Sequence, residues 1–438
     1  MIDHLQDETV RPGSAQALRF WWKLGWISFG GTAAHIAIMH DDLVERKKWI
    51  SNGQFLHALS HCMLLPGPEA QQLAIYIGWK LHGTKGGIVA GALFVLPSMF
   101  VLLALSVVYV RFGGLPWIGA MLSGLKPAVV ALVITATIRV ARRSLVTTLQ
   151  RIAALGAFAA MMWLHASLPL VMLSVILLGV LVGRCRPDLL GPASTVETHG
   201  RIAGSDARVR RRTALRVAWI VLTVIVLWLI PLFCLNRLSP DFAFWKQPSF
   251  FFTRTACVTF GGSYTVIPYV AQSAVTKYQW LSQRQMLDGF SLAETTPGPL
   301  IIVVAFVGFM AGFNHFNGSM LMGTVALLVT TFYTFLPCFL FVFAGAHIVE
   351  KSYGKRGIES VLRLITAVVV AAMLDLTVFL SRGVLFSAGS PGIKSLDAFA
   401  LAWIGVSLLL LQRFSLSAAK LVGLSLLAGI ARWSFAML

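Results

Sequence analysis

Two Pro-Gly-Pro triplets, each beside polar side chains, interrupt otherwise apolar stretches of this sequence. The two clusters comprise Pro66, Gly67, Pro68, Glu69, Gln71 and Gln72 in one stretch, and Thr295, Thr296, Pro297, Gly298 and Pro299 in the other. Proline removes an amide donor and disfavours helix at the residue before it, so each triplet predicts a break between two half-helices. The later half-helices would start near Pro68 and Pro299, where free N–H groups and partial positive charge can hold an anion.

Three carboxylates lie close to these triplets in the sequence. Glu69 follows the first triplet, and Asp288 and Glu294 precede the second. Glu69 and Glu294 could cap helix ends, carry protons in coupled transport, or pair with a cation; the candidate cations are Lys126, Arg254 and Arg363. We retain Glu69, Asp288 and Glu294 as proton-coupling candidates. Lys126 precedes a proline inside an apolar span, so it is either a buried cation facing substrate or a lysine that snorkels from a helix end.

A Phe-Gly-Gly motif followed by a hydroxyl precedes each triplet. The residues involved are Gly30, Gly31 and Thr32 in the first copy and Gly261, Gly262 and Ser263 in the second. Paired glycines allow a tight helix crossing, and they also allow backbone to leave helical geometry around a ligand. Because the motif recurs beside a second broken segment, we include these residues in the substrate-binding set.

Enzyme and cofactor motifs are lacking in the sequence. His57 and His61 are spaced four apart on one helix face, but the equivalent positions in the second copy are Asp288 and Leu292. No metalloenzyme constellation, Walker motif, dinucleotide-binding loop or nucleophile elbow is present, so we expect no cofactor, no metal and no enzymatic activity. An integral-membrane metalloenzyme using His57, His61 and Glu69 is the least favoured alternative.

The two motif pairs belong to an internal repeat. Phe29 and Phe260 are 231 positions apart, and so are Pro66 and Pro297. We therefore expect two homologous halves, residues 1–183 and 240–438, joined by residues 184–239, which hold an Arg-rich loop and one linking transmembrane helix. Six apolar segments fit each half. Six segments plus one linking span place the second half in the opposite orientation, an inverted repeat typical of secondary transporters.

Composition defines the class of protein. The chain has 438 residues, of which 57% are hydrophobic and 12% charged, against about 25% charged in soluble proteins. Its apolar runs approach the length of a bilayer span, so it is an all-α polytopic integral membrane protein. The net charge of +19 gathers in loops as the positive-inside rule describes, which favours a cytoplasmic N-terminus and disfavours nucleic-acid binding. No cleavable signal peptide is evident.

The two repeat regions resemble a known family. "FGGTAAHIAIMHDDLVERKKWISNGQFLHALSHCMLLPGPEAQQLAIYIGWKLHGTKGG" and "FGGSYTVIPYVAQSAVTKYQWLSQRQMLDGFSLAETTPGPLIIVVAFVGF" are similar to the signature regions of the chromate ion transporter family in its long two-domain form. The resemblance implies a bacterial inner-membrane protein that exports chromate, driven by the membrane potential or the proton gradient. It also implies about 10–13 transmembrane segments in antiparallel halves. Two positions depart from the family pattern: Ala305 replaces a common Gln, and His57 replaces a common acidic residue.

These observations predict a secondary transporter of chromate that binds the oxyanion at half-helix amino ends near the Pro-Gly-Pro breaks. The alternative is transport of sulfate or another small anion on the same scaffold. A non-transporting scaffold or sensor is disfavoured, because buried polar groups beside broken helices need a reason. The expected partners are a small inorganic oxyanion and the lipid bilayer, and a homodimer is compatible with the sequence.

Overall fold

The computed structural model describes residues 11–29, 31–63, 65–185, 207–239, 241–259, 266–349, 356–386, 396–414 and 416–437, and within them the fold is helical. The first half contains α1 (Ser14–Ile27), α2 (Gly31–His40), the π-helical η1 (Asp41–Arg46), α3 (Asn52–Cys62), α4 (Glu69–Phe112), α5 (Pro116–Ser144), α6 (Thr148–Trp163) and α7 (Leu168–Cys185). After α8 (Ala207–Leu238), the second half contains α9 (Phe242–Val258), α10 (Ile267–Gln272), the π-helical η4 (Ser273–Lys277), α11 (Gln283–Glu294), the 3₁₀ turn η5 (Leu300–Ile302), α12 (Val303–His315), α13 (Met320–Val349), α14 (Arg356–Leu385), α15 (Ala398–Arg413) and α16 (Ala418–Met437).

Local geometry recurs between the halves at equivalent positions. Ser51 and Ser282 each cap the next helix, α3 and α11, through a capping box with a glutamine three residues later. A π-helical segment precedes each cap. Phe20 packs on Trp49 with 5.3 Å between ring centroids, and its equivalent Phe251 packs on Trp280 at 5.6 Å. The repeat read from the sequence is thus also a repeat of helix order and of packing.

Each Pro-Gly-Pro triplet lies at the tip of a helical hairpin. In the second half Gly289 of α11 lies against Phe306 of α12, and Asn314 Nδ2 donates to the Trp280 carbonyl at 2.8 Å. These two contacts pair residues at similar distances on either side of the triplet, so α11 and α12 run antiparallel. In the first half the rings of His61 and Tyr76 lie 5.2 Å apart, and α3 contacts α4. The half-helices therefore fold back beside one another instead of continuing end to end.

The helix that follows each triplet turns again into a long apolar helix. In α4 the helical geometry is interrupted at His82 and Gly83, where Gly83 has φ +66°. A Cβ added at Gly78 would lie 2.6 Å from the Ala90 Cβ, so the two parts of α4 pack closely after the turn. A Cβ added at Gly312 of α12 would similarly lie 2.7 Å from the Ala326 Cβ of α13. Glycines permit this close approach in both halves.

Six helices in the described residues are long and apolar enough to cross a membrane. They are Glu69–Phe112, Pro116–Ser144, Ala214–Arg237, Met320–Gly345, Leu364–Leu385 and Ala418–Phe435, and the shorter apolar helices are Leu168–Val182, Leu300–His315 and Ala398–Arg413. With the continuous apolar composition, this confirms an all-α polytopic membrane protein.

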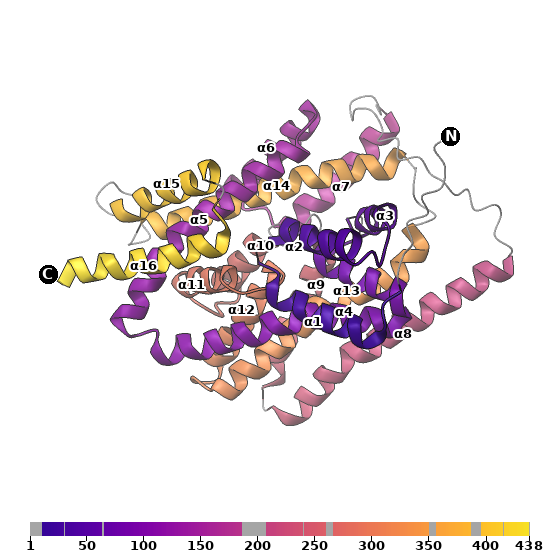
Figure 1. Cartoon of the computed structure of the whole chain (residues 1–438), viewed down its shortest axis with the longest axis horizontal. Coiled ribbons are helices and arrows are strands. Elements are labelled where there is room, and N and C mark those ends of the chain that lie inside the picture. The colour runs from indigo at the N-terminus through magenta and orange to yellow at the C-terminus, as the bar shows by residue number, and fades with distance from the viewer. Residues whose placement is uncertain are drawn as a thin grey trace.

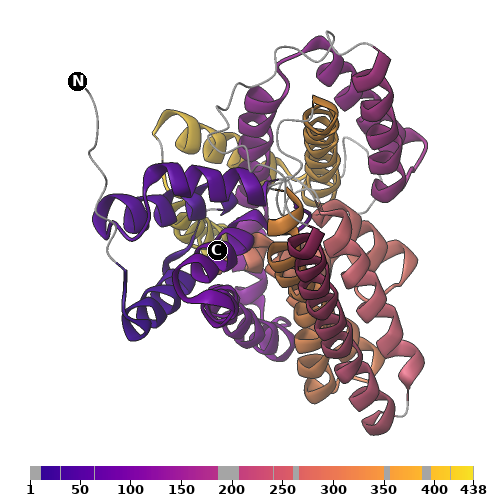
Figure 2. The same cartoon turned by 90° about the vertical axis from the view of Figure 1, so that its right-hand side faces the viewer.

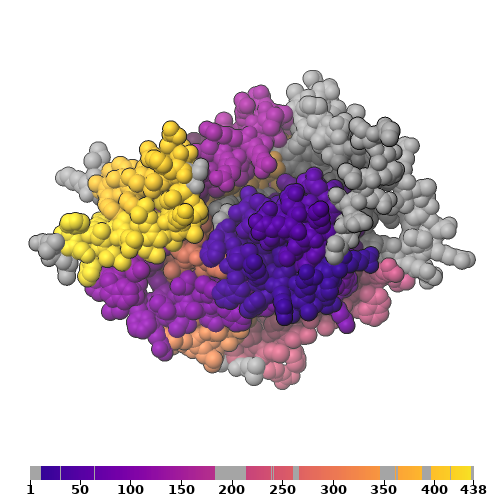
Figure 3. All heavy atoms as spheres, in the orientation of Figure 1, coloured from indigo at the N-terminus to yellow at the C-terminus, as the bar shows by residue number. Residues whose placement is uncertain are grey.

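The long helices surround the hairpins. Helix α5 packs against α14, α15 and α16, and α14 packs against α6 and α7. Figure 3 shows α15 and α16 gathered over one end of the molecule. The linking helix α8 lies at the margin in Figure 1, and Figure 2 shows the indigo N-terminal helices on the opposite side from the pink helices that follow residue 207. Trp228 holds α8 in place, because its Nε1 donates to Thr253 Oγ1 and its carbonyl accepts from the Tyr333 hydroxyl, both at 2.8 Å.

Candidate functional site

Two backbone hydrogen bonds cross between the halves at the hairpin tips. The amide of Gly67 donates to the carbonyl of Thr259 at 2.6 Å, and the amide of Gly298 donates to the carbonyl of Ser28 at 2.6 Å. Ser28 and Thr259 are equivalent residues, each immediately before a Phe-Gly-Gly motif. The Pro-Gly-Pro tip of each half is thus bound to the Phe-Gly-Gly approach of the other half. We call this arrangement the crossed tips.

Both central glycines have backbone conformations that favour glycine. Gly67 has φ +125° and Gly298 has φ +93°, a region that side-chain-bearing residues rarely adopt. A Cβ at Gly67 would lie 3.0 Å from the sulfur of Cys338 on α13, and one at Gly298 would lie 2.6 Å from the hydroxyl oxygen of Ser98 on α4. Each tip is therefore also packed against the long helix of the other half, and neither position has room for a side chain.

Three helix starts lie at the tips. Helix α2 begins at Gly31, α4 begins at Glu69 after the N-cap Pro68, and η5 begins at Leu300 after the N-cap Pro299. Neither proline supplies a side-chain cap, so the first-turn amides of α4 and η5 have no intrahelical acceptor. The amides of Gly67 and Gly298 are engaged in the crossed tips. The glycine amides are therefore not available to a ligand, whereas the first-turn amides of α4 and η5 have no acceptor within their helices.

Gln71 and Gln72, which follow the first triplet, are buried, and their side chains are only partly hydrogen-bonded within the protein. Gln72 Nε2 donates to the Pro66 carbonyl at 2.5 Å, while Gln72 Oε1 and Gln71 Oε1 have no protein donor among the described residues. Buried polar atoms of this kind are normally satisfied. Water or a protonated oxyanion would supply the missing donors.

The threonines before the second triplet use their hydroxyl protons locally. Thr295 Oγ1 donates to the Leu292 carbonyl at 2.6 Å, and Thr296 Oγ1 donates to the Ala293 carbonyl at 2.7 Å. These hydroxyls tighten the last turn of α11. Each can still accept a hydrogen bond, but in this arrangement neither donates one to an anion.

The candidate carboxylates have different surroundings. Glu69 is buried in the first turn of α4, where a helix amino end favours negative charge, and no described cation forms an ion pair with it. Glu294 is the last residue of α11 and is half-buried. Asp288 pairs with Lys126 at 2.7 Å and accepts a hydrogen bond from the Tyr109 hydroxyl at 3.0 Å.

The Lys126 pairing changes its predicted role. The ammonium is held by Asp288 across the interface between α5 and α11, so Lys126 is not a free cation facing substrate in this structure. Of the three cations considered as partners for Glu69 and Glu294, Lys126 is held by Asp288, Arg254 lies in a separate pocket, and the side chain of Arg363 lies outside the described residues.

Parts of the predicted site lie outside the described residues, namely Gly30, Gly261, Gly262 and Ser263. Gly31 has φ +80° and Thr32 is partly exposed one residue into α2. His57 and His61, the pair of the least favoured alternative, both lie on α3, where His61 packs on Tyr76; in the described part of the chain no group of three His, Cys, Asp or Glu side chains is suited to a metal.

Sequence reasoning missed two residues, one buried within the first half and one that pairs across the two halves. His35 of α2 is fully buried with its ring 5.6 Å from that of Phe94, and Tyr109 of α4 completes the Asp288 pair. His35 has a valine at the equivalent position, and neither residue belongs to a recurring motif. An isolated histidine or tyrosine in an apolar helix gives no signal until the partner helices are placed.

Comparison with known proteins identifies the family. The chromate transporter family model matches residues 15–183 and 247–432, which include all the residues of the crossed tips. The chain belongs to the chromate transporter family. It is 28% identical to the chromate transport protein of Cupriavidus metallidurans over 416 residues, covering 90% of this chain and 87% of that one.

Other family members match over similar lengths. A probable chromate transport protein of Synechococcus elongatus is 28% identical, with 84% of each chain covered. The chromate transport protein of Pseudomonas aeruginosa is 29% identical over 73% of this chain and 69% of its own. No solved structure matches this chain. These relatives are named as transport proteins, so membership of the chromate transporter family makes this chain a transport protein rather than an enzyme.

Proposed function

We propose that this chain is a secondary transporter that exports chromate from the cytoplasm across the bacterial inner membrane. Family membership supports chromate transport, and the apolar helices support a multi-pass membrane protein. Its units are residues 1–183, a linker of residues 184–239, and an inverted second unit of residues 240–438, with the N-terminus in the cytoplasm. The linking helix α8 and the recurrence of the tip geometry are consistent with this division.

The crossed tips carry the proposal for the binding site. Because each triplet is hydrogen-bonded to the other half, the amino ends of α2, α4 and η5 are brought toward a common region. Helix amino ends stabilise anions through free amides and the helix dipole. We place the oxyanion there, beside Thr32, Gln71 and Gln72.

The membrane potential is the energy source that best fits the chemistry of the tips. A dianion leaving a negative-inside cell gains about 2.3 kcal/mol per charge per 100 mV, so roughly 4.6 kcal/mol for chromate at 100 mV. At Glu69, an ionised carboxylate beside the oxyanion would repel it, while a protonated one could donate to it, so proton binding would favour oxyanion binding. A proton released outward with chromate would move against an inward proton gradient, so Glu69 would link export to pH without driving it.

Cellular accumulation tests the transport function. Cells that express the chain should accumulate less labelled chromate than cells with an empty vector, and excess sulfate should not abolish the difference. Equal accumulation in both would refute export. A difference that sulfate removes completely would favour the alternative, a transporter of sulfate-like anions in general.

A further inference from the structure

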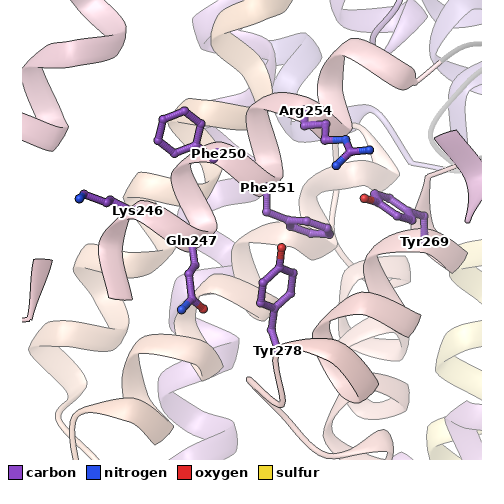
Figure 4. A pocket seen from close by; sticks show the side chains of 7 residues that line it. All are labelled: Lys246, Gln247, Phe250, Phe251, Arg254, Tyr269 and Tyr278. Carbon is purple, nitrogen blue, oxygen red and sulfur yellow. The ribbon is translucent and has the colours of Figure 1, made fainter. Parts of the chain in front are cut away.

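A cationic pocket outside the crossed tips lies on the exposed side of α9. It has a volume of about 280 Å³ and is lined by Lys246, Gln247, Phe250, Phe251, Arg254, Tyr269 and Tyr278. None of these residues is acidic. In Figure 4 the Arg254 guanidinium and the Tyr269 hydroxyl point toward one another, and the Tyr278 hydroxyl points into the space below Phe251, while Lys246 points away.

Arg254 is the charged centre of this pocket. It is the thirteenth residue of the 17-residue α9 and is exposed, and no described carboxylate lies within ion-pair distance of it. An arginine with no carboxylate partner leaves its N–H donors to water or to an anion. The pocket therefore needs an anionic ligand more than an apolar one.

The aromatic wall is rigid and supplies hydroxyl donors. Tyr278 stacks on Trp280 with 4.6 Å between centroids and 12° between planes, and Phe251 packs against Tyr269 and Tyr278 at 5.4 and 5.3 Å. Rings held in this way fix the direction of the phenol groups. Two phenolic O–H donors beside a guanidinium suit an oxyanion, which accepts hydrogen bonds at several oxygens.

Arg254 lies close in sequence to the crossed tips. Thr259, whose carbonyl accepts from Gly67, is five residues further along the chain, about 7.5 Å in helical rise, and is buried while Arg254 is exposed. The equivalent residue in the first half is Lys23, which is likewise exposed and likewise five residues before its tip residue, Ser28. In both halves, a cation thus lies five residues before the carbonyl that accepts from the other half's Pro-Gly-Pro glycine.

We propose that the Arg254 pocket is an anion-collecting vestibule that binds the transported oxyanion before it reaches the crossed tips, with Arg254, Tyr269 and Tyr278 as its ligands. This inference rests on the proposed transport function.

Flux kinetics in proteoliposomes test the vestibule. Arg254→Gln should raise the KM for chromate about tenfold, the factor that 1.4 kcal/mol represents, with little change in maximal rate. Arg254→Lys should recover part of the affinity. Arg413→Gln, which removes an exposed arginine at the end of α15, is the matched control and should behave as wild type. Equilibrium dialysis with labelled chromate should show the same loss of affinity in purified Arg254→Gln protein.

Several results would overturn the vestibule. If the wild-type protein transports chromate and Arg254→Gln keeps a wild-type KM, only the vestibule is wrong. A defect of Arg254→Gln that appears only in vesicles with anionic lipid, and not in vesicles of zwitterionic phosphatidylcholine alone, would assign the pocket to an anionic lipid headgroup. If the wild-type protein moves no chromate, the transport proposal and the vestibule both fall.

Discussion

The buried ion pair between Lys126 and Asp288 should lose more stability when the lysine is replaced than when the aspartate is replaced. The pair is 2.7 Å long, and its lysine side chain is 17% exposed while the aspartate is 3% exposed. Removing one partner of a buried pair costs about 3–5 kcal/mol, because the remaining charge is left unpaired. The size of the cost depends on whether that remaining group can reach water.

Lys126→Met strands a carboxylate that is almost wholly buried, so we expect the full cost of about 3–5 kcal/mol. Asp288→Asn leaves the more exposed lysine, whose long stem can carry the ammonium toward water, and the new amide can still accept from Tyr109. We expect about 1–3 kcal/mol for this variant.

The double variant Lys126→Met with Asp288→Asn removes both charges and should be more stable than Lys126→Met alone. Unfolding of the purified protein in detergent, compared across this cycle, measures the coupling, which we expect to be about 2–3 kcal/mol. Lys126→Gln at a matched protein yield controls for the change of side-chain shape. If Asp288→Asn proves as costly as Lys126→Met, or if the double variant equals the sum of the singles, the reasoning from burial is refuted.

Two further predictions concern the tips and the surface. Gly67→Ala and Gly298→Ala should each cost about 1–3 kcal/mol because φ is positive and a Cβ finds no space, while Gly114→Ala, with open space around it, should be neutral in the same unfolding assay. At the start of α9 the pKa of Asp241 lies below its usual range, because its carboxylate accepts from the Phe244 amide and bonds His315. A lowered folded-state pKa gives stability that is present above the unfolded-state pKa and is lost as the pH falls through the folded-state pKa. Acid should therefore lower the melting temperature, and Asp241→Asn should make the melting temperature less dependent on pH. An unchanged acid profile in the variant would exclude this pair as a source.

Much of the fold followed from patterns that recur in the sequence. Apolar composition identified the membrane class, and the 231-position offset pairs Phe29 with Phe260 and Pro66 with Pro297, next to the residues that form the crossed tips. The equal spacing of the glycine motifs can be read from the sequence, because it does not depend on how the chain folds.

The partners across the interface could not be predicted in the same way. The sequence gives two half-helices around each triplet, but their folding back as a hairpin depends on tertiary contacts such as Gly289 with Phe306. Lys126 was predicted either to face substrate or to snorkel, and its pairing with Asp288 depends on how α5 meets α11. Burial of His35 likewise depends on Phe94, which lies on a distant helix in the sequence.

Chromate flux in proteoliposomes tests the central claim most directly. With chromate in excess on the side that corresponds to the cytoplasm and an imposed potential negative on that side, the wild-type protein should move chromate outward faster as the potential increases. Gly67→Trp and Gly298→Trp, inserted at wild-type levels, should abolish that flux because they displace the crossed tips. Flux that is absent in the wild type, or that persists at the wild-type rate in both glycine variants, would contradict the account.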